Sequence, residues 1–133
     1  MQVEWSLEIG APRTRVELTT VRDERDLERV LDDIEREAPE PVVAELVAAD
    51  GARLGIGLGG PSSVLAFNPS PEPPYLISLG DAGSLDGDAG FYLHGHWTEF
   101  PRTALVPNAA AREAARRFIR NGNRPDNVEW EEV

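Results

Sequence analysis

The chain has 133 residues and a formal charge of −11, because 24 aspartates and glutamates stand against 13 arginines, with no lysine and no cysteine. The lack of cysteine excludes disulfides, thiolate metal sites and cysteine nucleophiles. The acidity argues against direct binding to nucleic acid or to an anionic membrane, because both need a basic face. The length indicates one domain over residues 1–133.

The first residues predict a strand. Apolar residues alternate with polar ones over residues 2–9, which is typical of a half-buried strand, and Val16 and Leu18 add a short extended piece. The beginning of the chain shows neither the basic cluster nor the apolar run of a secretory signal. No apolar run approaches the ~20 residues of a membrane span. We therefore expect a cytoplasmic protein.

The clearest predicted element is a helix that begins after Asp23 and ends before Pro39. Asp23 can cap its first turn, and proline cannot continue it. Its apolar positions follow the spacing of one helix face: Leu27, Val30, Leu31 and Ile34. Its remaining faces are strongly acidic and include Asp32, Asp33 and Glu35.

From Pro41 onward the pattern changes to that of strands linked by turns. Apolar runs at residues 42–47, 54–58, 64–67, 75–79 and 91–100 predict successive strands. Asp50-Gly51 is a strong hairpin turn, and Gly95 marks a turn or bulge. A glycine- and aspartate-rich loop at residues 80–90 carries Asp81, Asp86 and Asp88.

A second helix is predicted after Pro107, with Asn108 as its N-cap and Gly122 just past its end. Its apolar stripe comprises Ala111, Ala114, Ala115, Phe118 and Ile119. Its arginines, Arg112, Arg116, Arg117 and Arg120, are interpreted as a solvated face rather than a phosphate site. Val128 and Trp130 form a last strand. The fold class is therefore α+β, an antiparallel meander sheet of about six or seven strands with two helices packed on one face.

Gly55, Gly57 and Gly60 have the spacing of a dinucleotide-binding loop. That motif needs a helix directly after the glycines, to hold the pyrophosphate. Here Pro61 is followed by a strand-like run, so we interpret the glycines as positions of close packing or a bulge in a sheet.

Three further patterns in the sequence suggest a metal site or a catalytic site, but each lacks residues or spacing that such a site needs. His94 and His96 would share one strand face and could hold a metal with Glu99, but a zinc site needs further support. The aspartates of the 80–90 loop do not have the spacing of a calcium loop. Ser62 or Ser63 would need one of the histidines as its base, and neither stands on a nucleophile elbow. We expect no metal, no cofactor and no catalysis.

Each of the three tryptophans, Trp5, Trp97 and Trp130, lies near acidic residues. A tryptophan in a small domain usually fills the core. Trp97 lies between polar stretches and close to a glycine, so we expect it to be the exception that contacts a partner.

Four stretches together resemble immunity protein family one of bacterial polymorphic toxin systems. They are Gly57-Leu58-Gly59-Gly60-Pro61-Ser62-Ser63-Val64-Leu65, Pro74-Tyr75-Leu76-Ile77-Ser78-Leu79-Gly80, Trp97-Thr98-Glu99-Phe100-Pro101 and Val128-Glu129-Trp130. The resemblance runs from the first helix to the last strand. It implies a small α+β cytoplasmic protein that neutralises a cognate toxin, usually of the deaminase type, without catalysis of its own.

Charge and resemblance lead to the same kind of partner, since a toxin that modifies nucleic acid carries a basic substrate channel. We expect an acidic surface to occlude that channel, with no direct nucleic-acid or membrane contact and with a monomer as the simpler state. The expected contact residues are Asp81, Asp86, Asp88, Trp97, Glu99, Glu129, Glu131 and Glu132. The competing surface is Asp32, Asp33 and Glu35 of the first helix. The alternatives are an adaptor without a toxin partner and a small enzyme that uses His94 or His96.

Overall fold

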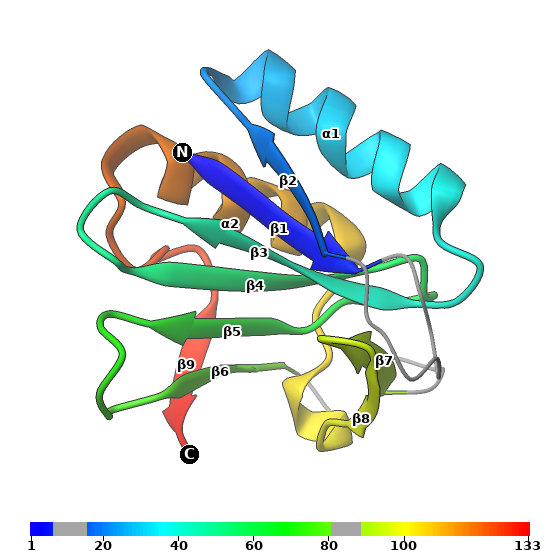
Figure 1. Ribbon diagram of the computed structural model, residues 1–133. Helices are drawn as coiled ribbons and strands as arrows, with labels where there is room; N and C mark the ends of the chain where they lie inside the picture. Colours follow the sequence, from blue (N-terminus) through cyan, green and yellow to red (C-terminus); the bar gives the residue numbers. More distant parts are fainter. Residues whose placement is uncertain (7–15, 81–88) are drawn as a thin grey trace.

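The computed structural model describes residues 1–6, 16–80 and 89–133, with the side chains of residues 5, 6, 16 and 17 outside the description. In chain order the elements are β1 (Gln2–Ser6), β2 (Val16–Thr20), α1 (Glu24–Glu37), β3 (Val42–Val47), β4 (Arg53–Leu58), β5 (Leu65–Asn68), β6 (Leu76–Leu79), β7 (Gly90–Leu93), β8 (His96–Glu99), the short 3-10 helix η1 (Arg102–Ala104), α2 (Asn108–Asn121) and β9 (Glu129–Glu132) (Figure 1). No helix in these ranges is long and apolar enough to cross a membrane.

The strands form one sheet whose main path runs β2-β1-β3-β4-β5-β6-β9, with every neighbouring pair antiparallel. The hairpin β7–β8 lies beside this path, and β7 joins β3 through the single parallel pair Val42–Tyr92. The predicted antiparallel α+β architecture is confirmed. The main path has seven strands, and the hairpin adds two more within the described residues. The first strand ends at Ser6, and the rest of its predicted range, residues 7–9, lies outside the described residues.

Both helices bury their apolar stripes against the same face of the sheet. Leu46 of β3, Ile56 of β4 and Phe67 of β5 belong to one buried cluster with Leu31 of α1 and Phe118 of α2. Alternate residues of a strand point to opposite faces, so this cluster takes every second residue of the central strands. The prediction of two helices on one face is thus confirmed, and we call the opposite side of the sheet the outer face.

The outer face has a smaller core of its own under the hairpin and η1. Phe91 of β7 is fully buried there beside Val43, Val64 and Leu105. A Cβ atom at Gly57 would lie 2.7 Å from Cε1 of Phe91, so the phenyl ring occupies the space that a side chain on β4 would need. The strand β5 follows these glycines, not a helix. The interpretation of the glycine pattern as close packing is therefore confirmed.

The helix ends follow the sequence except at one cap. Asp23 accepts a 2.8 Å hydrogen bond from the backbone N–H of Asp26, and Gly122 ends α2 in the left-handed conformation, both as predicted. The prediction of Asn108 as N-cap is wrong: Pro107 holds that position. The side chain of Asn108 instead accepts a 2.6 Å hydrogen bond from the Ser63 hydroxyl. It therefore ties the start of α2 to the loop before β5.

Candidate functional site

Three of the four arginines of α2, Arg112, Arg116 and Arg120, form ion pairs with acids of α1. The guanidinium of Arg112 contacts Glu28 at 3.0 Å, and Asp32 and Glu35 at 3.1 Å each. Its side chain is only 15% exposed. Two more pairs extend the contact along the helices: Arg116 with Glu28 at 2.5 Å and Arg120 with Glu24 at 2.6 Å. We call this set of ion pairs the interhelical charge network.

This network corrects the interpretation of the arginines as a solvated face. It also weakens α1 as a docking surface, because Asp32 and Glu35 already share Arg112 and Asp33 pairs with Arg36 on its own helix. A carboxylate already paired within its own molecule offers less attraction to an outside cation. The competing acidic surface is therefore largely neutralised from within.

The pKa values of several groups in these ion pairs are shifted in the direction that the pairing predicts. Hydrogen bonding from Arg116 holds the pKa of Glu113 below its ordinary 4.5, helped by Arg117. The hydrogen bond from Arg117 likewise lowers the pKa of Asp126. The pKa of Arg116 is raised, chiefly by its hydrogen bond to Glu28. Each shift favours the charged form, as expected for ion pairs.

Seven carboxylates of the described chain make no ion pair and cap no backbone group: Glu37, Glu40, Glu72, Glu99, Glu129, Glu131 and Glu132. Three of them fall in the four residues of β9. All three are exposed. The densest uncompensated negative charge in the described residues therefore lies on this strand. Its three glutamates, Glu129, Glu131 and Glu132, are among the residues predicted to contact a partner.

β9 holds these glutamates on a firmly attached strand. It pairs with β6 over four residues, from Leu76–Glu132 to Leu79–Glu129. Trp130 turns toward the helical side, 6.1 Å from the ring of Phe67, and its indole N–H donates to the carbonyl oxygen of Pro125 at 2.8 Å. The packing role predicted for Trp130 is confirmed. The neighbouring glutamates project from a strand that the core keeps in place.

Trp97 of β8 is 46% exposed, which fits a contact residue although its partner role stays a prediction. Its indole covers Gly90, where a Cβ atom would overlap the ring, and packs edge-on against Tyr92 at 5.0 Å between centroids. Beside it lies a hollow of about 280 Å³ lined in part by Glu99 and Arg102. A fixed aromatic ring next to a hollow is a common form of partner anchor.

The structure does not join all the predicted contact residues. Among the described strands, β8 pairs only with β7 and β9 pairs only with β6, so the two groups lie on separate parts of the sheet (Figure 1). The remaining predicted contacts, Asp81, Asp86 and Asp88, lie outside the described residues.

The histidine pair does not have the geometry assumed for a metal site. His94 and Gly95 form the turn between β7 and β8, both with positive φ (51° and 81°), so His94 is not on the strand that begins with His96. Positive φ at both positions is typical of a tight hairpin turn. Among the described residues no group of three or more His, Cys, Asp or Glu side chains could hold a metal ion.

Sequence reasoning missed a charged cluster on the outer face. Nε2 of His94 lies 2.7 Å from Oε1 of Glu45, a buried oxygen that has no hydrogen-bond partner among the described residues. Arg53 contacts Glu4 at 3.1 Å and Glu45 at 3.7 Å. These residues are far apart in sequence. The available signal was a single charge within each of two otherwise apolar strands, β3 and β4.

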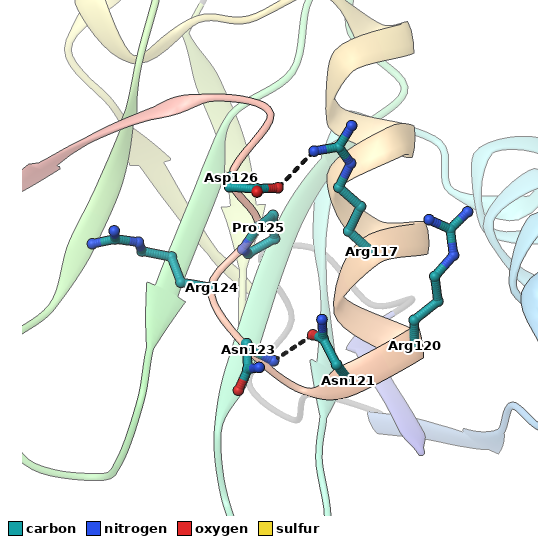
Figure 2. Close-up of a pocket in the computed structure, with 7 residues that line it drawn as sticks. All are labelled: Arg117, Arg120, Asn121, Asn123, Arg124, Pro125 and Asp126. Carbon is teal, nitrogen blue, oxygen red and sulfur yellow. Dashed lines mark hydrogen bonds and ion pairs between the residues drawn. The ribbon is translucent and has the colours of Figure 1, made fainter.

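Another hollow, of about 430 Å³, lies at the end of α2 and is lined by Arg117, Arg120, Asn121, Asn123, Arg124, Pro125 and Asp126 (Figure 2). Arg117 points at Asp126 and contacts it at 2.6 Å, and Arg120 is engaged by Glu24. The carboxyl end of a helix also disfavours anions. Arg124 also lines the hollow and makes no ion pair among the described residues, but Figure 2 shows its side chain pointing away from Arg117 and Arg120. The hollow therefore does not gather several free cations, as an anion site would.

Fold and surface together define a small acidic α+β domain whose most distinctive surface feature is a strand of unpaired glutamates. Residues 15–132 match the model of the family described as Immunity protein Imm1. The chain belongs to this family, which confirms the resemblance seen in the sequence and makes it an immunity protein. A comparison with curated proteins finds no match.

Proposed function

We propose that this immunity protein binds and neutralises a cognate toxin domain of the nucleic-acid deaminase class, in the cytoplasm, by covering the basic substrate channel of the toxin with an acidic surface. The Imm1 family supports a toxin as the partner. The charge of −11 supports a basic protein as that toxin. A deaminase that extrudes a base from nucleic acid needs a cationic groove for the strand, which gives such a surface its target.

The distribution of paired and unpaired carboxylates carries the proposal. The interhelical charge network uses the acids of α1 within the molecule, whereas Glu129, Glu131 and Glu132 have no cation partner among the described residues. Uncompensated charge extends its potential into solvent and attracts an oppositely charged partner. The acidic surface of the proposal is therefore β9, with Glu99 and Trp97 as a second group.

The attachment of β9 favours a tight complex. Trp130 fixes the strand to the core and β6 pairs with it over its whole length. A surface that is already rigid loses little conformational entropy on binding. Complementary charge also accelerates encounter. Fast and tight capture is what a producer cell needs from an inhibitor of its own toxin.

Neutralisation is proposed to occur by occupation of the channel, with no chemistry by the immunity protein. The hydroxyl of Ser63, one of the two serines considered as a nucleophile, has structural partners: it lies 2.9 Å from the carbonyl oxygen of Gly57 and 2.6 Å from Asn108. Carboxylates of β9 would stand where substrate phosphates otherwise bind.

Co-expression tests the proposal directly. The C-terminal domain encoded by the neighbouring gene is expressed alone, with this protein, and with the variant Glu129→Arg/Glu131→Arg/Glu132→Arg. We expect growth arrest with the toxin domain alone. This protein should restore growth and co-purify with the toxin domain, whereas the variant should fail to restore growth. The triple reversal Glu37→Arg/Glu40→Arg/Glu72→Arg, at carboxylates that make no ion pair in the described residues, is the charge-matched control, and an inactivated toxin controls for expression load. Persistent toxicity with the unaltered protein would contradict an immunity role toward this toxin.

Deamination itself supplies the second readout. Purified toxin is incubated with single-stranded and duplex substrates, and conversion of cytosine or adenine is followed with increasing immunity protein. We expect loss of conversion at one equivalent. A toxin that is neutralised but has a different activity would leave the immunity role intact and overturn the deaminase assignment.

A further inference from the structure

β9 presents an open backbone edge as well as acidic side chains. It is the last strand of the main path, and among the described strands only β6 pairs with it. The backbone N–H of Val133 donates to the carbonyl oxygen of Tyr75 at 2.9 Å. Successive amides of a strand point in opposite directions. The N–H groups of Glu129 and Glu131 therefore face β6, and those of Trp130 and Glu132 face outward.

The side chains around this edge combine charge with apolar area. Glu131 pairs with Ile77 and Glu129 with Leu79, so both glutamates lie on the outer face of the sheet. Two large exposed apolar side chains of the same ribbon are near them, Tyr75 at 39% and Leu79 at 37% exposure. A partner would gain both ion pairs and buried apolar surface here.

The charge of the edge also restricts what can pair with it. An open strand edge is a template for any extended chain, and like charges on it discourage pairing with a second copy. Three glutamates in four residues would face three more in an antiparallel self-pair. The edge therefore selects a strand that carries cations.

We propose that the cognate toxin adds an extended segment bearing arginine or lysine to the outer edge of β9, continuing the sheet across the interface. This rests on the proposed function, because the toxin is the partner. The outward backbone groups of Trp130 and Glu132 make the main-chain hydrogen bonds. Cationic side chains opposite Glu129 and Glu131 supply the selectivity, which is the division of labour in strand addition.

The edges of β2 and β8, which are also open among the described strands, fit such a segment less well. β2 has one acid in its five residues, Glu17, against three in the four residues of β9. β8 carries one acid, Glu99, and belongs to a hairpin that a single bridge joins to the main sheet. Charge complementarity therefore favours β9.

Residue-resolved amide hydrogen exchange tests the proposal on the wild-type protein, free and bound to the inactivated toxin domain encoded by the neighbouring gene. In the free protein the amides of Glu131 and Val133 should be protected and those of Trp130 and Glu132 exposed. In the complex we expect the exchange of Trp130 and Glu132 to slow by about tenfold or more, since both gain hydrogen bonds.

A pair of substitutions isolates the backbone. Glu132→Pro removes an outward N–H, which an edge strand tolerates, and Glu132→Ala removes the same charge but keeps the N–H. We expect the proline variant to bind the toxin domain about tenfold more weakly than the alanine variant, by roughly the free energy of one hydrogen bond plus the lost fit of the ring. Continued protection of the Glu131 amide in the free proline variant shows that β6 pairing is kept; if it is lost, the wild-type exchange data decide alone.

The outcomes separate this proposal from the one on which it rests. Equal affinity of the two variants together with unchanged exchange at Trp130 and Glu132 would overturn strand addition and leave the immunity role standing. Slowed exchange at the amides of β2 or β8 in place of β9 would overturn it as well. Absence of any complex with the toxin domain would overturn both.

Discussion

Gly57 shows how one absent side chain shapes the outer face of the sheet. The ring of Phe91 lies over this position, and the hairpin that carries Phe91 packs on the sheet because β4 offers that space. The sequence could predict that the glycines belong to packing, because no helix follows them. It could not predict Phe91 as the neighbour, since 34 residues separate the two positions. The predicted capping role of Asn108 is wrong for a related reason: its side chain accepts a hydrogen bond from Ser63, a tertiary contact that capping rules do not include.

Gly57→Ala should lower the free energy of unfolding by about 1–3 kcal/mol, because the added methyl group would force the Phe91 ring to move. Urea unfolding measures the change. In a Phe91→Ala background the same substitution should cost at least ~1 kcal/mol less, because the obstructing ring is gone. Strict additivity of the two substitutions would show that the ring does not require the glycine.

The lowered pKa of Glu113 predicts how the stability of the protein depends on pH under acidic conditions. Its pKa is lowered in the folded protein by its hydrogen bonds from Arg116 and Arg117, relative to an ordinary value of 4.5. Its stabilising contribution is therefore present above that value and is lost as the pH falls through the folded pKa. The free energy of unfolding should fall between about pH 5 and pH 3, and Glu113→Gln should make this fall shallower. Parallel profiles for the two proteins, measured by urea unfolding at each pH, would contradict this role.

At the scale of elements, the pairing of α1 with α2 is the largest departure from expectation. Both helices, their ends and their apolar stripes are readable from periodicity and capping residues, as Asp23 and Gly122 illustrate. Taken separately, the charged face of each helix predicts exposure to solvent. The crossing of the helices, which brings Arg112 among three acids of α1, is a tertiary fact that no local pattern contains.

Arg112→Ala should destabilise the protein by about 1–2 kcal/mol, because it leaves three carboxylates of α1 close together without their shared cation. Arg36→Ala is the matched control: the Arg36 side chain is 70% exposed and its ion pair among the described residues lies within α1, so the expected change is within about 0.5 kcal/mol. Thermal and urea unfolding at low and high salt compare the two. If both variants lost equal stability, the interhelical charge network would not hold the helices together.

At the scale of the whole molecule, the structure shows which part of the described surface carries the unpaired negative charge. The sequence supplied the excess of acids and, through the family resemblance, a toxin as partner. It placed candidate charges on α1, on the 80–90 loop and at the last strand without choosing among them. Within residues 1–6, 16–80 and 89–133, the candidate acids of α1 are paired with arginines and the glutamates of β9 are not. That choice required knowing where α2 lies, which explains why composition and spacing could go no further.

The rate of association with the toxin domain, measured by stopped flow over a range of salt concentrations, tests the central claim most directly. Glu129→Gln/Glu131→Gln/Glu132→Gln should slow association about three- to tenfold at low salt and flatten its salt dependence. Asp32→Asn/Asp33→Asn/Glu35→Gln, which changes the net charge equally, should have the smaller effect, with folding checked by circular dichroism. Association slowed by the α1 variant and unaffected by the β9 variant would contradict the account.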